Sequence, residues 1–113
     1  MNLEELRNIC LSFPQVTEDI KWEDHLCFNI GSKIFMITSP GTVPVSASFK
    51  VSEDDFEQLI QMKGFSAARY LAKHKWVSID DISLLNQQEW ERLARQAYSI
   101  IASKLPLKFR KNL

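Results

Sequence analysis

Glycine is scarce in this sequence, with only three in 113 residues, at positions 31, 41 and 64. Loops that cradle phosphates, of the GxxxxGKS/T or GxGxxG type, need several glycines so that the backbone can approach the phosphate closely. Neither pattern is present. The sequence therefore excludes the common glycine-rich nucleotide loops and argues against nucleotide hydrolysis.

Cysteine and histidine are also scarce, with two of each. Their spacing fits no zinc site, so we expect no bound metal and no cofactor. Cys10 and Cys27 have neither close spacing nor a secretory context, which favours free, buried thiols. His25, Cys27 and Asn29 alternate along one predicted strand, as in a cysteine-nucleophile set, but such neighbours diverge and nothing supplies an oxyanion hole. We therefore expect no catalytic residues and no enzymatic activity.

The sequence also lacks a long apolar run. No stretch approaches the roughly 18 apolar residues of a membrane span, and the acidic N-terminus has no signal-peptide core. We expect a cytoplasmic protein without a membrane segment. With 45% hydrophobic residues, residues 1–113 are expected to form one domain around one core, in which residues 108–113 are a loose basic tail.

Net charge is absent as well, because 14 basic residues balance 14 acidic ones. A general nucleic-acid binder would carry a strongly basic surface. The distribution is uneven, however: residues 1–62 hold four Lys or Arg against ten Asp or Glu, a balance of −6, and residues 63–113 hold ten against four, a balance of +6. We expect a dipolar molecule if the two halves do not interleave.

Three segments show helical patterns. Residues 2–12 begin with a capping-box pair, Asn2 and Glu5, and a second such pair, Asn86 and Glu89, opens a segment that continues to Leu105 before Pro106. Apolar residues recur at spacings of three and four in both segments. A shorter helix follows the cap at Ser52 and stops before Gly64.

Short strands are predicted between these helices. Residues 19–22, 45–51 and 76–79 have strand-like composition, and Leu26–Ile30 and Lys33–Ile37 flank the pair Gly31-Ser32, which suits a type II′ hairpin. That turn pairs Phe28 with Phe35 and Leu26 with Ile37 on the helix side. It leaves four residues on the other side of the hairpin, namely Cys27, Asn29, Ile34 and Met36. The predicted fold is α+β, a two-layer domain with an antiparallel sheet covered on one face by the N- and C-terminal helices.

Cations and large aromatic residues are interleaved over residues 69–79. Cations attract phosphate and rings supply contact area, so the stretch can serve an anionic partner. The alternative is that Tyr70, Leu71, Trp76 and Ile79 belong to the core and its rim, with the charges on a solvated edge. Both interpretations remain open from the sequence.

Several motifs together resemble the MmcQ/YjbR family, from about residue 3 to residue 108. The motifs are Trp22-Glu23-Asp24-His25, Lys33-Ile34-Phe35, Ser48-Phe49-Lys50, Tyr70-Leu71, Lys73-His74-Lys75-Trp76-Val77, Ala97-Tyr98 and Lys104-Leu105-Pro106. The resemblance implies a CyaY-like fold and a DNA-binding protein, with double-stranded DNA as the partner. Carried over residue by residue, the implied nucleic-acid surface comprises Lys50, Arg69, Tyr70, Lys73, His74, Lys75 and Trp76.

Two other functions compete with DNA binding. A protein-interaction or scaffold module would use the outer sheet face around Asn29, Ile34 and Met36 to bind a protein partner. Frataxin-like cation binding follows only from fold analogy.

Overall fold

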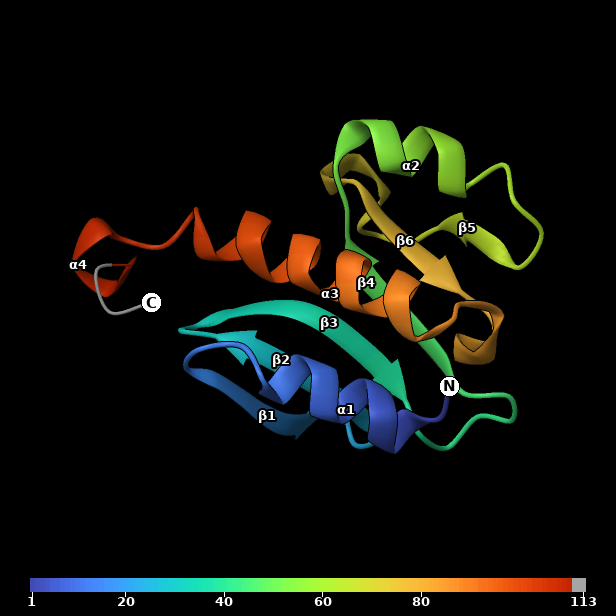
Figure 1. Ribbon diagram of the computed structural model, residues 1–113, viewed down its shortest axis with the longest axis horizontal. Coiled ribbons are helices and arrows are strands. Elements are labelled where there is room, and N and C mark those ends of the chain that lie inside the picture. Colours follow the sequence, from blue (N-terminus) through green and yellow to red (C-terminus); the bar gives the residue numbers. More distant parts are fainter. Residues whose placement is uncertain (111–113) are drawn as a thin grey trace.

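Six antiparallel strands form one sheet, and helices cover one of its faces, as the α+β prediction requires (Figure 1). The computed structural model describes residues 1–110. The strands are β1 (Val16–Lys21), β2 (His25–Ile30), β3 (Lys33–Ser39), β4 (Ser46–Lys50), β5 (Phe65–Ala67) and β6 (Trp76–Ile79), in the spatial order β1-β2-β3-β4-β6-β5. The helices are α1 (Leu3–Leu11), α2 (Glu53–Leu59), α3 (Gln87–Ala102) and α4 (Leu107–Arg110), with short 3₁₀ turns at Ala72–His74 and Ile82–Leu84.

Both predicted capping boxes are present. The Asn2 side chain accepts from the Glu5 amide at 2.8 Å, and the Asn86 side chain accepts from the Glu89 amide at 2.8 Å. Each pairing satisfies amides that have no partner inside the helix, and so fixes where α1 and α3 begin. α3 ends at Ala102, three residues before the predicted Leu105, which still packs into the core from the following turn.

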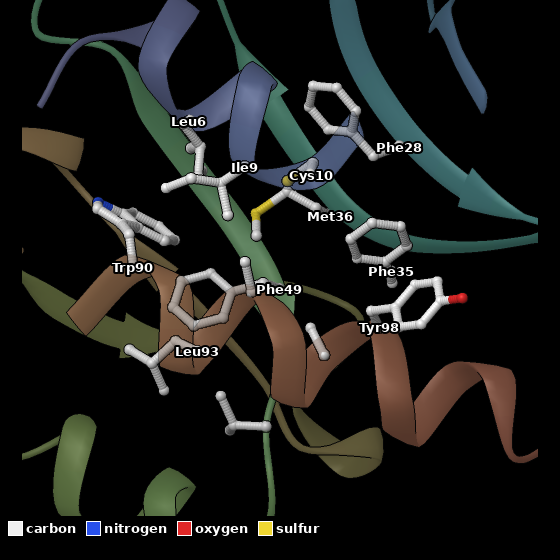
Figure 2. Close-up of a cluster of buried hydrophobic side chains, with 14 of the residues drawn as sticks. Leu6, Ile9, Cys10, Phe28, Phe35, Met36, Phe49, Trp90, Leu93 and Tyr98 are labelled. Carbon is white, nitrogen blue, oxygen red and sulfur yellow. The ribbon is translucent and has the colours of Figure 1, made fainter. Parts of the chain in front are cut away.

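The core lies between the sheet and the pair α1 and α3 (Figure 2). Phe28, Phe35 and Phe49 are fully buried on the sheet side, and Trp90 of α3 packs against Phe49 with ring centroids 5.2 Å apart. The Trp90 indole N–H donates to the Ile82 carbonyl at 2.8 Å, so this buried polar group is satisfied. These contacts hold α3 across the sheet.

The β2–β3 hairpin has its predicted turn but a different register. Gly31 has a φ of +61° at the first turn position. Phe28 pairs with Met36 and Cys27 with Ile37, because an irregularity between Phe28 and Asn29 leaves Phe35 as an extra residue. A bulge of this kind shifts the alternation of faces by one residue. The predicted pairs Phe28–Phe35 and Leu26–Ile37 are therefore wrong, and Met36 lies in the helix-side core with Phe35.

Other predicted segments differ in extent. Strand β5 was not predicted, and it lies at the sheet edge beside β6. β1 begins at Val16 rather than at residue 19. Residues 107–110 form α4 instead of a loose tail, and Phe109 packs partly buried against the core. The rest of that predicted tail, residues 111–113, lies outside the described residues.

The face of the sheet opposite α1 and α3 also buries side chains. Cys27, Ala68 and Trp76 are each less than a tenth exposed, yet none belongs to the helix-side core cluster. Among residues 1–110, no helix combines the length and the apolar character that crossing a bilayer requires.

Candidate functional site

A hollow of about 950 Å³ opens on the outer face of the sheet, and residues from both ends of the sheet line it. Trp22 follows β1 and His25 begins β2, and Arg69 and Tyr70 follow β5 at the opposite edge. Ile101 and Lys104, from the end of α3 and the turn after it, complete the lining. The full lining is Trp22, His25, Ser32, Lys33, Ile34, Ile37, Ser39, Ser48, Ala68, Arg69, Tyr70, Leu71, His74, Trp76, Ser78, Ile101 and Lys104.

The strands supply this hollow with both apolar surface and hydroxyl groups. Ser48 and Ser78 pair across β4 and β6, and their hydroxyl oxygens lie 2.7 Å apart. Trp76 is only 6% exposed and lines the hollow beside them. Because Ile37 follows the hairpin bulge, it faces this side of the sheet instead of the helices. The lining therefore offers apolar contact area with a few hydrogen-bonding groups.

Two exposed aromatic rings stand at the hollow. Trp22 is 63% exposed and Tyr70 is 83% exposed. The Trp22 ring contacts His25 edge-on, with centroids 6.0 Å apart, and the Arg69 guanidinium carbon lies 5.2 Å from the Tyr70 ring centroid. Both aromatic residues have left-handed backbone conformations, with φ of +51° at Trp22 and +68° at Tyr70.

The charged residues that line the hollow are all basic. Lys33, Arg69 and Lys104 line it, and no aspartate or glutamate does so within the described chain. None of these three cations makes an ion pair with another residue of the range 1–110. The site is thus electrostatically suited to an anion.

Lys50 lies beside the hollow in an unusual environment. The residue is 8% exposed, and its ammonium donates a hydrogen bond to the His74 carbonyl. Burial lowers the pKa of Lys50, and the nearby positive charges of Lys104 and Lys75 lower it further. Lys50 therefore adds positive potential near the hollow but is not part of its lining.

The structure brings together four of the seven residues predicted for the nucleic-acid surface, namely Arg69, Tyr70, His74 and Trp76. Lys73 is exposed outside the lining. Lys75 is also outside it, because its ammonium lies 4.9 Å from the ring centroid of Phe56 in α2. The predicted patch is thus split, with its aromatic part in the hollow and two of its lysines elsewhere.

Sequence reasoning missed several residues of the hollow, chiefly Trp22, His25, Lys33, Ser48 and Lys104. Each of them belongs to a motif on which the family resemblance rests. The resemblance therefore contained the signal, but the residues lie far from residues 69–76 in sequence. Only the fold shows that they share a surface with Arg69 and Tyr70.

The possible cysteine site has the features of an inert thiol. Cys27 is fully buried, its Sγ contacts the His25 carbonyl oxygen at 3.8 Å, and burial raises its pKa. His25 Nδ1 lies 2.9 Å from a carboxylate oxygen of Asp24 but without hydrogen-bond geometry. Within the part of the chain that the structure describes, no three His, Cys, Asp or Glu side chains cluster as metal ligands would.

The outer-face surface predicted for a protein partner does not form. Met36 is fully buried in the helix-side core. Asn29 is 7% exposed, and its amide donates to Asp19 at 2.9 Å. Of the three, only Ile34 lines the hollow.

Comparisons with known proteins agree with this architecture. A family model described as YjbR matches residues 11–100. A Deinococcus radiodurans protein with a DUF419 domain is similar in structure, with a TM-score of 0.86 and 23% identity over 97% of this chain and 86% of that one. A Pseudomonas syringae protein is similar with a TM-score of 0.72 and 17% identity, over 88% of this chain and 98% of that one. At these identities the likeness shows a shared fold and nothing further. No curated protein sequence matches the chain.

Proposed function

The chain belongs to the YjbR family, and we propose that it is a non-enzymatic DNA-binding protein whose contact surface is the hollow on the outer face of the sheet. Phosphate groups of the DNA lie against Lys33, Arg69 and Lys104 in this proposal, and the aromatic rings supply contact area. The observation that carries the proposal is the lining of the hollow. Among the residues that the structure describes, every charged residue in that lining is basic.

Some other cations of the described chain differ from those in the hollow because they are neutralised by a carboxylate. Arg7, Lys21 and Arg92 each pair with a carboxylate, at 2.6 Å to Glu18, 2.6 Å to Asp19 and 3.1 Å to Asp55. A second hollow, between α1 and α3, mixes charges of both signs, with Glu5, Glu91, Arg92 and Arg95 in its lining. An anionic partner gains more at the outer face, because the lining of that hollow contains no aspartate or glutamate among the described residues.

The zero net charge of the chain is compatible with local attraction. Electrostatic interactions in salt solution are screened beyond about 10 Å, so a phosphate at the hollow responds to the cations around it more than to distant acids. Binding of this kind releases counterions and is salt-dependent. With three phosphate contacts, log affinity falls with log salt at a slope of roughly −2.7 for duplex DNA.

The proposal that the protein is not an enzyme is supported by the two cysteines, whose thiols are buried and unreactive. The thiolate is the reactive form of cysteine, and burial raises the pKa of Cys27, so the thiol stays protonated near neutral pH. Cys10, on the opposite side of the sheet, is fully buried as well, and burial also raises its pKa.

Charge reversal at the hollow tests the proposal. We expect Arg69→Glu and Lys104→Glu each to weaken binding of a short, fluorescently labelled mixed-sequence DNA by about tenfold at about 50 mM salt. Anisotropy titrations with the strand and with its duplex give the affinities. Lys63→Glu is the matched control, because Lys63 is exposed and does not line the hollow. Absence of binding to either form of DNA, or equal weakening by Lys63→Glu, contradicts the proposal.

A further inference from the structure

Trp22 and Tyr70 expose large aromatic rings to solvent. They are 63% and 83% exposed, and neither belongs to the core cluster. They come from opposite ends of the sheet and line the same hollow. Exposed apolar groups that gather around a hollow are typical of a contact surface.

Both residues have a positive φ, a backbone conformation in which an aromatic residue is unfavourable. A φ near +50° to +70° favours glycine, because a side chain adds strain there, and bulky residues adopt it rarely. Packing does not account for the rings, since both are exposed. Strained backbone of this kind is concentrated at functional sites, where the side chain is needed in a particular place.

The neighbours of the rings match the chemistry of a nucleotide. Arg69 lies over the Tyr70 ring, and Lys33 and Lys104 provide two more cations in the lining. The paired hydroxyl groups of Ser48 and Ser78 can bind polar edges of a base. Ile34 and Ile37, with the small exposed part of Trp76, provide the apolar surface that a base face covers on binding.

We infer that the nucleic acid taken by the hollow is a strand with unpaired bases, which stack on Trp22 and Tyr70 while their phosphates contact Arg69, Lys33 and Lys104. This inference rests on the proposed function and narrows its ligand. In a duplex the base faces are stacked on one another and the surface presented is mostly phosphate and sugar, which has no complement in Trp76, Ile34 and Ile37. An unpaired base offers its face to an aromatic ring whatever its identity.

The test compares one DNA strand of mixed sequence with its duplex, in anisotropy titrations at the same salt concentration. We expect the strand to bind at least about tenfold more tightly than the duplex, since stacking adds to the phosphate contacts only in the strand. Tyr70→Gly and Trp22→Gly should each weaken strand binding by about tenfold. Val43→Ala is the control, because Val43 is 99% exposed and lies outside the hollow.

Glycine is chosen for the two variants because it suits the left-handed backbone, so both proteins should fold at least as well as the original. Thermal unfolding followed by circular dichroism checks this. Duplex binding as tight as strand binding, or strand affinity that Tyr70→Gly and Trp22→Gly leave unchanged, overturns the inference and leaves the proposed function standing. Failure of both strand and duplex to bind overturns the two together.

Discussion

Lys50 is a charged residue whose side chain the fold buries. From the sequence it alternates with Ala47 and Phe49 in the pattern of a strand with one wet face, and that alternation is confirmed. The side chain is nevertheless buried, because Trp76 and the 3₁₀ turn at Ala72–His74 cover this part of the outer face. A strand pattern specifies which side a residue faces, but not what covers that side.

We predict that Lys50→Met does not destabilise the protein at pH 7 and raises the free energy of unfolding by about 0.5–2 kcal/mol. The lowered pKa of Lys50 means that protonation is less favourable in the folded chain than in the unfolded chain. The original protein therefore gains stability as pH rises from that lowered pKa towards the ordinary value of 10.5, and its difference from Lys50→Met shrinks.

Urea unfolding at pH 7 and at about pH 10 measures both effects. Lys73→Met serves as the control, because Lys73 is exposed and forms no ion pair with the described residues. A loss of more than about 1 kcal/mol in Lys50→Met at pH 7 would show that its hydrogen bond to His74 outweighs the penalty of burial.

The β2–β3 hairpin shows what sequence resolves at the scale of an element. Its turn was predicted from Gly31-Ser32, because a two-residue loop with glycine first is a local signal. Its register was wrong because the bulge depends on the packing of Phe35 and Met36 together under the helices, which is not local. β5 was missed for a similar reason: three residues are too short for a period-two pattern, and its pairing with β6 is tertiary.

We predict that Gly31→Ala lowers the free energy of unfolding by about 1 kcal/mol or more. Alanine at position 31 would have to adopt a φ of +61°, and its Cβ would lie 3.1 Å from Cδ2 of Leu105, so the turn or the Leu105 side chain would have to shift. Gly41→Ala is the matched control, since nothing lies within 4 Å of its Cβ and its φ is not positive. Equal stability of the two variants in urea unfolding would show that the hairpin turn tolerates a side chain.

At the scale of the whole molecule, the site depends on elements that lie far apart in the sequence. The basic second half of the chain supplies Arg69 and Lys104, as its charge balance suggested, but Lys33 comes from the acidic first half. The family resemblance and the α+β sheet were predictable because they rest on ordered motifs and local periodicity. The hollow was not, because its lining combines residues near the end of β1 with residues after β5, which lie at opposite edges of the sheet.

The three tryptophans provide the most direct test of the proposal that DNA binds at the hollow. Trp22 and Trp76 line the hollow, whereas Trp90 is fully buried on the helix side and serves as an internal control. We predict that titration with a short DNA strand at low salt shifts the indole N–H resonances of Trp22 and Trp76 in nitrogen-15 NMR spectra and leaves that of Trp90 in place. Unchanged resonances for Trp22 and Trp76 while DNA binds would contradict the outer face as the binding surface.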